Sequence, residues 1–255
     1  MRALSLPGCA CRGAFQLGVL SRLTKAGEQF DLVAGASSGS VSGAALVAGL
    51  AADGPDMWRA MASTPVFSPR YLRSQRSPFG MSVILRDALR RYLPEEKLHR
   101  TEAELLVATT RARRFFTGQK DALVVHSNRE RRDMHDVIVA SCFIPVVYAQ
   151  VPWLDGEVHI DGGASDNTLI DALVARGATD ITVISPFPEG RIARTLFSPE
   201  EPPRAPPHVR LRLIFPERPL RQRNFDFAPG PLEEALTMPH KELILEPSVR
   251  PTRTA

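Results

Sequence analysis

The sequence predicts an α/β fold in which a mostly parallel sheet lies between two layers of helices. A short apolar strand, residues 2–6, ends at Pro7-Gly8 and is followed by a helical pattern that stops at Gly27. A second strand, residues 31–35, passes abruptly into a helix of small residues, 40–52. Strand, glycine turn and helix in this repeated order are typical of parallel α/β architecture. We therefore expect a single three-layer α/β/α domain over residues 1–255.

The segment that follows differs in character, because prolines surround one clear amphipathic helix between residues 64 and 100. The apolar face of that helix is formed by Met81, Ile84, Leu85, Ala88, Leu89 and Tyr92. We expect residues 64–100 to form a cap whose helix packs this face on the core.

The rest of the chain is expected to return to strands and short helices. The apolar stretch 137–154 contains two prolines, which favours buried strand and turn over a membrane span. Asp155-Gly156 then forms the turn of a hairpin. The remaining elements are expected to be strands at 104–109, 122–126, 181–185 and 209–215, helices at 168–176 and 232–245, a proline-rich surface loop at 186–207 and a tail at 246–255.

Composition excludes several classes of protein. With 44% hydrophobic and 24% charged residues the chain is neither disordered nor fibrous. A net charge of +4 is mild for this length, and no nucleic-acid partner is expected. Cys9, Cys11 and Cys142 form no disulfide framework and lack the partners of a zinc site, so they are expected to be reduced. We expect a cytoplasmic chain, since too few apolar residues precede Cys9 for a signal peptide.

The strongest chemical signal is a G-x-S-x-G motif at residues 35–39, between an apolar strand and a small-residue helix. A serine on so tight a turn sits in strained backbone, and its neighbours Gly35 and Gly39 must be small for it to project. The N-terminus of the following helix favours negative charge on an acyl oxygen. Ser37 is thus a candidate nucleophile; the alternative is a phosphate-binding or purely structural turn.

Two further motifs accompany it. The loop between the first strand and first helix consists of Gly8, Cys9, Ala10, Cys11, Arg12 and Gly13, and its backbone amides suit an oxyanion hole or a phosphate cradle. It lacks the lysine and the glycine spacing of nucleotide-binding loops. Asp161, followed by Gly162 and Gly163, ends a strand and can project from the edge of a sheet. The alternative is a turn aspartate, which is the interpretation we give to Asp155.

Together these motifs resemble those of the patatin-like phospholipases (patatin-like acyl hydrolases). That family has a glycine-rich loop ending in Arg-Gly or Lys-Gly, a G-x-S-x-G elbow and a later D-G-G or D-G-A, in the order found here. Shorter similarities occur at residues 15–20, 140–145 and 167–177. The chain departs from the family at Cys9 and Ala10, where glycines are usual, and at Leu169, where proline is usual. Amide groups survive such changes, but a positive φ is harder to adopt with a Cβ.

The resemblance implies a Ser37–Asp161 dyad without histidine, acting on phospholipid or related acyl esters. The loop 8–13 would supply the oxyanion hole, and Arg12 would fix that loop, contact a lipid phosphate or make an ordinary structural contact. A carboxylate can serve as the base if it is hydrogen-bonded to the serine in a partly desolvated site. No metal or other cofactor is expected. The oligomeric state stays open.

Alternatives to this dyad remain at this stage. In a Ser–His–Asp esterase, His208 or His240 would follow Asp161 in the order of an α/β-hydrolase. A non-enzymatic alternative is a silent domain of the same family that binds lipid or a protein partner. Aromatic and apolar residues also alternate with arginines in residues 64–100, a mixture that suits peripheral contact with an anionic membrane. The arginines concerned are Arg70, Arg73, Arg76 and Arg86.

Overall fold

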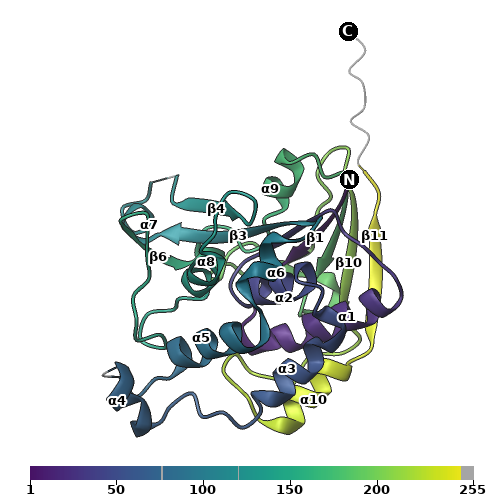
Figure 1. Ribbon diagram of the computed structural model, residues 1–255. Coiled ribbons are helices and arrows are strands. Elements are labelled where there is room, and N and C mark those ends of the chain that lie inside the picture. Colours follow the sequence, from purple (N-terminus) through teal and green to yellow (C-terminus); the bar gives the residue numbers. More distant parts are fainter. Residues whose placement is uncertain (76, 120, 248–255) are drawn as a thin grey trace, which may run out of the picture.

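A mixed sheet, parallel at its centre, organises the molecule (Figure 1). The computed structural model describes residues 1–75, 77–119 and 121–247. The strands of this sheet are β1 (Arg2–Leu6), β2 (Leu32–Gly35), β3 (Glu104–Arg111), β4 (Leu123–Ser127), β5 (Trp153–Leu154), β6 (Glu157–Asp161), β7 (Asp180–Ile184), β10 (Arg210–Pro216) and β11 (His240–Leu245). Their order is β11-β10-β7-β1-β2-β3-β6-β5, with β4 also paired to β3. Strands β10, β7, β1, β2 and β3 are mutually parallel, and the others join antiparallel.

Helices cover both faces of the sheet, as the sequence predicts. The α-helices are α1 (Gly13–Lys25), α2 (Ser38–Val47), α3 (Gly54–Ala60), α4 (Leu72–Gln75), α5 (Met81–Tyr92), α6 (Glu95–His99), α7 (Ala112–Phe116), α8 (Met134–Ser141), α9 (Ile170–Ala175) and α10 (Pro229–Thr237). One core cluster packs α1, α2, α3, α5, α8 and α10 on one face of the sheet. A second cluster packs α9 on the other face, on the opposite side of the sheet in Figure 1. The three-layer architecture is therefore confirmed.

The expectation of buried strand and turn over residues 137–154 is wrong at its start. Helix α8 occupies residues 134–141, and strand structure begins only at Trp153. Val137, Ile138 and Val139 are almost fully buried in the core, so no polar face marks the run as helical. A short apolar run of this kind cannot be separated from a buried strand by periodicity.

The expectation of one helix over residues 232–245 is also wrong. Helix α10 ends at Thr237, and residues 240–245 form the antiparallel edge strand β11. Pro239 lies between them, and proline in a helix interior removes an amide donor and clashes with the preceding turn. Helix α2 is likewise shorter than expected. It ends at Val47, with Gly49 at a φ of +73°.

The proline-rich segment 186–207 is more than a surface loop. It contains a small antiparallel pair, β8 (Ile192–Ala193) with β9 (Glu200–Glu201), and Ile192 is buried in the second core cluster. Its backbone also joins the Asp-Gly-Gly region, because Leu196 N–H donates to Gly163 O at 2.8 Å. The hairpin predicted around Asp155-Gly156 is present, with both residues at positive φ.

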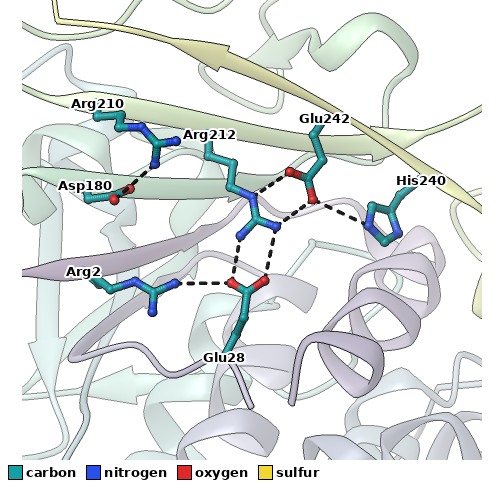
Figure 2. Close-up of polar contacts among 7 residues, drawn as sticks. All are labelled: Arg2, Glu28, Asp180, Arg210, Arg212, His240 and Glu242. Atoms are coloured by element: carbon teal, nitrogen blue, oxygen red, sulfur yellow. Dashed lines mark hydrogen bonds and ion pairs between the residues drawn. The ribbon is translucent and has the colours of Figure 1, made fainter. Parts of the chain in front are cut away.

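A chain of ion pairs fastens the edge of the sheet to the loop before β2. Figure 2 shows Arg212 of β10 between two carboxylates, donating to Glu28 at 2.7 Å and to Glu242 of β11 at 2.6 Å. Arg2 also donates to Glu28, and His240 lies 3.7 Å from Glu242. The Arg212 side chain is only 16% exposed, so these contacts are shielded from water more than a surface pair is.

In the part of the chain that the structure describes, no helix combines the length and the apolar character needed to cross a bilayer.

Candidate active site

Ser37 sits at the point where β2 turns sharply into α2. Its backbone has φ 52° and ψ −130°, a conformation that costs energy for a residue with a side chain. Its amide donates to Ser141 Oγ at 2.9 Å, and its carbonyl accepts from Ser40 Oγ at 2.6 Å. These contacts on both sides hold the strained turn in place.

The two glycines of the motif are required by close backbone approach. A Cβ on Gly35 would lie 2.5 Å from Gly39 O, and a Cβ on Gly39 would lie 1.8 Å from Leu6 O. Both distances are far below van der Waals contact. The spacing of the motif thus follows from the packing of the turn against β1.

Asp161 lies next to this turn because of the register of β3. Strand β3 pairs with β2 through residues 104–107, where Gly35 is opposite Val107. It pairs with β6 through residues 109–111, where Asp161 is opposite Thr109. Since β4 occupies the other side of β3 over residues 106–110, β6 must continue on the side where β2 ends. The end of β6 therefore meets the end of β2.

The Asp161 carboxyl is buried and only half satisfied. Its Oδ1 accepts from Gly163 N–H at 2.8 Å, while Oδ2 has no hydrogen-bond partner within the described residues. Burial raises the pKa of Asp161 to about 7, and the nearby Ser37 side chain and the Gly163 amide oppose that rise. A carboxyl of this kind is ready to accept a proton near neutral pH.

The loop of residues 8–13 follows β1, on the other side of β2 from this carboxyl, and most of its amides are already bonded. The acceptors are Asn167 Oδ1 for Gly8, Ser38 Oγ for Cys9, Asn224 O for Cys11, Cys9 O for Arg12 and Ala10 O for Gly13. Within the described residues only the Ala10 N–H of this loop lacks an acceptor. Ser38, the residue after Ser37, also has an amide without an acceptor there.

Two positions at which the sequence departs from the family pattern keep unusual backbone. Ala10 has φ 52°, the left-handed conformation that glycine adopts more easily. Leu169, at the start of α9, has φ 54°, which the ring of proline does not permit. The loop thus keeps a positive φ despite the alanine, and the chain at residue 169 runs differently from one that carries proline.

A C-terminal segment holds the loop from outside. Asn224 O accepts from Cys11 N–H at 2.9 Å, and Gln222 O accepts from Arg12 Nε at 3.3 Å. Arg12 also lies over the ring of Phe187. Of the roles expected for Arg12, the structure shows a carbonyl contact that fixes the loop. No sequence pattern indicated that residues 222–224 contact the loop of residues 8–13, because the two segments are more than 200 residues apart in the chain.

An apolar cavity opens beside Ser37, and its empty space is about 860 Å³ when the open solvent at its mouth is counted. Ser37, Ser38 and Ala10 form its polar end. Its walls come from α3, α5, the segment that follows α8 and the C-terminal segment; they include Met57, Trp58, Met81, Ile84, Leu85, Ala88, Leu89, Tyr92, Ile144, Tyr148, Phe225 and Phe227. The apolar face predicted for the 81–92 helix therefore lines this cavity as well as packing on the core.

The histidines named as alternatives lie far from Ser37 in the topology. His208 precedes β10 at the end where the parallel strands begin, opposite the edge that carries Ser37. His240 is on β11, separated from β2 by β10, β7 and β1. Among the described residues no histidine bonds to Ser37 or Asp161. Buried His126 and His159 both contact Thr109 Oγ1 instead, at 2.7 and 2.8 Å.

The three cysteines surround the site as neutral thiols. Burial raises the pKa of Cys9 and of Cys11 to about 12 and raises that of Cys142 as well. All three are unpaired. No cluster of three histidine, cysteine or carboxylate side chains that would suit a metal occurs among residues 1–75, 77–119 and 121–247.

A strained serine on a strand-to-helix turn, next to a buried carboxyl and an apolar cavity, gives this α/β protein the geometry of a nucleophile elbow. The family model of patatin-like phospholipases matches residues 4–174, and the chain belongs to that family. The resemblance inferred from the sequence is thus confirmed, and the family implies a lipid acyl hydrolase. Among solved structures, VipD from Legionella pneumophila is similar to the chain with a TM-score of 0.39 and 15% identity. The match covers 72% of this chain and 50% of that one, so the chain spans about half the length of VipD. No curated protein matches it.

Proposed function

We propose that the protein is a serine lipid acyl hydrolase that cleaves phospholipid or related acyl esters through Ser37, Asp161 and an acyl-enzyme. The observation that carries the proposal is the meeting of a strained serine and a half-satisfied buried carboxyl at one end of an apolar cavity. Each part has a plain chemical use. Strain projects the hydroxyl, burial makes the carboxylate a better base, and the cavity accepts an acyl chain.

In the first half of the reaction Asp161 Oδ2 takes the proton of the Ser37 hydroxyl as Oγ bonds to the acyl carbonyl carbon. The amides of Ala10 and Ser38, which have no acceptor within the described residues, are the candidate donors to the resulting oxyanion. When the tetrahedral intermediate collapses, the bond from carbon to the alcohol oxygen breaks. The alcohol leaves with the proton held by Asp161.

In the second half water repeats these steps. Asp161, again ionised, takes a proton from water as its oxygen bonds to the acyl carbon, and the bond to Ser37 Oγ then breaks. The serine recovers the proton and the carboxylic acid leaves. One carboxyl can serve both halves because its pKa, about 7, is close to neutral pH.

The test combines a covalent label with turnover. The purified full-length chain is incubated with a fluorophosphonate probe and, separately, with nitrophenyl esters of increasing acyl length and with phospholipid. We expect labelling at Ser37, located by mass spectrometry of peptides, and turnover that improves with acyl length. Ser37→Ala and Asp161→Asn should each lower kcat by roughly a thousandfold or more.

The matched control is Ser42→Ala, because Ser42 lies on the same helix α2 but does not line the cavity. It should keep both labelling and turnover. A folded wild-type chain that neither labels nor turns over any ester would instead support a silent lipid-binding domain, whose ligand would occupy the same cavity. Full activity of Asp161→Asn would exclude the dyad.

We also propose that the enzyme works in the cytoplasm and meets its substrate by peripheral contact with a membrane. Three buried, unpaired thiols with high pKa agree with a reducing compartment.

A further inference from the structure

Exposed apolar side chains gather on two segments that flank the cavity. Residues 65–75 present Phe67, 60% exposed, and Leu72, 49% exposed. Residues 146–153 present Val146, Val151 and Trp153, which are 73%, 50% and 67% exposed. Large apolar side chains that are exposed together, rather than singly, mark interaction sites.

Both segments continue the walls of the cavity. Ile144 and Tyr148 line the cavity, and Val146 stands between them at a turn with φ 76°. On the other segment the Phe67 ring packs against Phe79 at 5.4 Å, two residues before the cavity-lining Met81. Val146 therefore lies beside the wall of the cavity and Phe67 near the start of α5, and Leu72, Val151 and Trp153 belong to the same two segments.

A hydrogen bond fixes one of the two segments to the helix that lines the cavity. Gln150 N–H donates to Ser82 Oγ at 3.2 Å, which holds the 146–153 segment against the start of α5. The helix α4 (Leu72–Gln75) lies at the margin of the molecule in Figure 1, beyond α5 and away from the sheet. We call Phe67, Leu72, Val146, Val151 and Trp153 the rim surface.

The only charged side chains on the two stretches of chain that carry the rim surface are arginines, and the nearby Asp155 is paired with Arg131. Residues 57–86 contain five arginines and no aspartate or glutamate, and residues 137–154 contain no charged residue. Arg59 and Arg86 are neutralised by carboxylates elsewhere. The exposed Arg70 and Arg73 form no ion pair within the described residues, and Arg76 lies outside them.

We infer that the rim surface docks on an anionic phospholipid bilayer, so that a lipid acyl chain passes from the bilayer into the cavity beside Ser37. Aromatic and aliphatic tips enter the boundary between headgroups and acyl chains, while Arg70 and Arg73 contact lipid phosphates. The inference rests on the proposed function for the substrate. It adds the surface, its orientation and the charge of the membrane.

Vesicle binding tests the docking separately from catalysis. The Ser37→Ala chain, which leaves lipid intact, is sedimented with phosphatidylcholine vesicles and with mixed phosphatidylcholine–phosphatidylglycerol vesicles. We expect binding to the mixed vesicles, weakened by added salt, and little binding to phosphatidylcholine alone. Arg70→Gln with Arg73→Gln should weaken binding to the mixed vesicles by roughly 25-fold, about five-fold for each charge.

Phe67→Ser with Trp153→Ser tests the apolar part, and Leu243→Ser with Ile244→Ser is its matched control. Leu243 and Ile244 are 40% and 44% exposed, but they lie on β11, at the opposite end of the sheet order from β5. We expect the first pair to lower vesicle binding by about ten-fold or more. In the active enzyme, which keeps Ser37, the same pair should lower the ratio of turnover on vesicles to turnover on a soluble ester by a similar factor. The control pair should leave both unchanged.

Fluorescence supplies a measurement that needs no variant. Trp58 is 8% exposed and Trp153 67%, so an aqueous quencher reports on Trp153, and mixed vesicles should shield it. Equal binding by the Phe67/Trp153 pair and the control, or unshielded Trp153, would overturn the inference. The inference would also be overturned if the wild-type chain formed an oligomer in solution and the Phe67/Trp153 double variant did not. The rim surface would then be a contact between two copies of the chain. Vesicle binding without ester turnover would support the docking and contradict the proposed function. Ester turnover without vesicle binding would support the proposed function and contradict the docking.

Discussion

Asn167 and Gly8, 159 residues apart in the chain, are joined by two hydrogen bonds. Asn167 Oδ1 accepts from Gly8 N–H at 2.8 Å, and Nδ2 donates to Gly8 O at 3.2 Å. The same Nδ2 donates to Ala193 O at 3.3 Å. One buried amide therefore links the loop of residues 8–13 to the segment that follows Asp161 and to the small β8–β9 pair.

We predict that Asn167 positions the loop for catalysis. Asn167→Ala leaves two backbone groups of Gly8 buried without partners, and displacement of the loop should lower kcat by roughly 10- to 100-fold with a smaller change in KM. Asn167→Asp should be worse, since a carboxylate repels both the Gly8 carbonyl and a forming oxyanion. Steady-state kinetics on a soluble ester measures both variants.

Asn128 offers the control for this prediction. It is also buried, with Oδ1 accepting from Leu105 N–H and Nδ2 donating to Leu98 O, but it does not touch the loop. Asn128→Ala should lower the unfolding free energy and leave kcat of the folded enzyme unchanged. Equal loss of kcat in both alanine variants would show that Asn167 is merely structural.

The sequence predicted the strands of the main sheet other than β11, and it located the three motifs, because each depends on local chemistry. Apolar runs bounded by glycine or proline define β1, β2 and β7, and small residues define the turn at Ser37. Helix α8 was missed because a buried helix shows no polar face. Strand β11 was missed because the helix expected at residues 232–245 was continued past Pro239. The contacts of Asn224 and Gln222 could not be predicted, because both residues accept through their backbone carbonyls, which leave no mark on the sequence, and their donors are distant in the chain.

The positive φ of Ala10 yields a prediction about stability. An alanine in the left-handed conformation costs about 1 kcal/mol, which glycine avoids, although glycine loses more conformational entropy on folding. Ala10→Gly should therefore leave the unfolding free energy within about 0.5 kcal/mol of wild type and keep activity. Ala14→Gly, inside helix α1, should lose about 1 kcal/mol or more. Denaturant unfolding compares them, and equal losses would contradict the strained backbone at residue 10.

The raised pKa of Asp161 predicts opposite pH effects on activity and stability. The base must be ionised, so kcat/KM should rise with pH through about 7 and then level off. Its pKa in the folded chain lies above the ordinary value of 3.8, so the protonated carboxyl stabilises the fold fully below 3.8, and this contribution is lost as pH rises through 7. As the pH rises from 3.8 to about 7, the unfolding free energy of Asp161→Asn should accordingly fall less than that of wild type. An activity limb near the ordinary carboxyl pKa would contradict the buried, half-satisfied geometry.

The ion-pair chain centred on Arg212 should contribute measurably to stability. Arg212→Met leaves Glu28 and Glu242, both partly shielded, without their shared cation, and should lower the unfolding free energy by about 1–2 kcal/mol. Arg210→Met, on the same strand, removes weaker contacts to Asp180 and Glu246 at 3.3 and 3.6 Å and should cost about 0.5 kcal/mol or less. Hydrogen bonding to Arg212 lowers the pKa of Glu242 from its ordinary 4.5, so this stabilisation is present above 4.5 and is lost as pH falls through the lower folded value. The difference in unfolding free energy between wild type and Arg212→Met, measured by denaturant unfolding, should therefore become smaller in acid. A difference that stays constant with pH would show that the loss comes from packing alone.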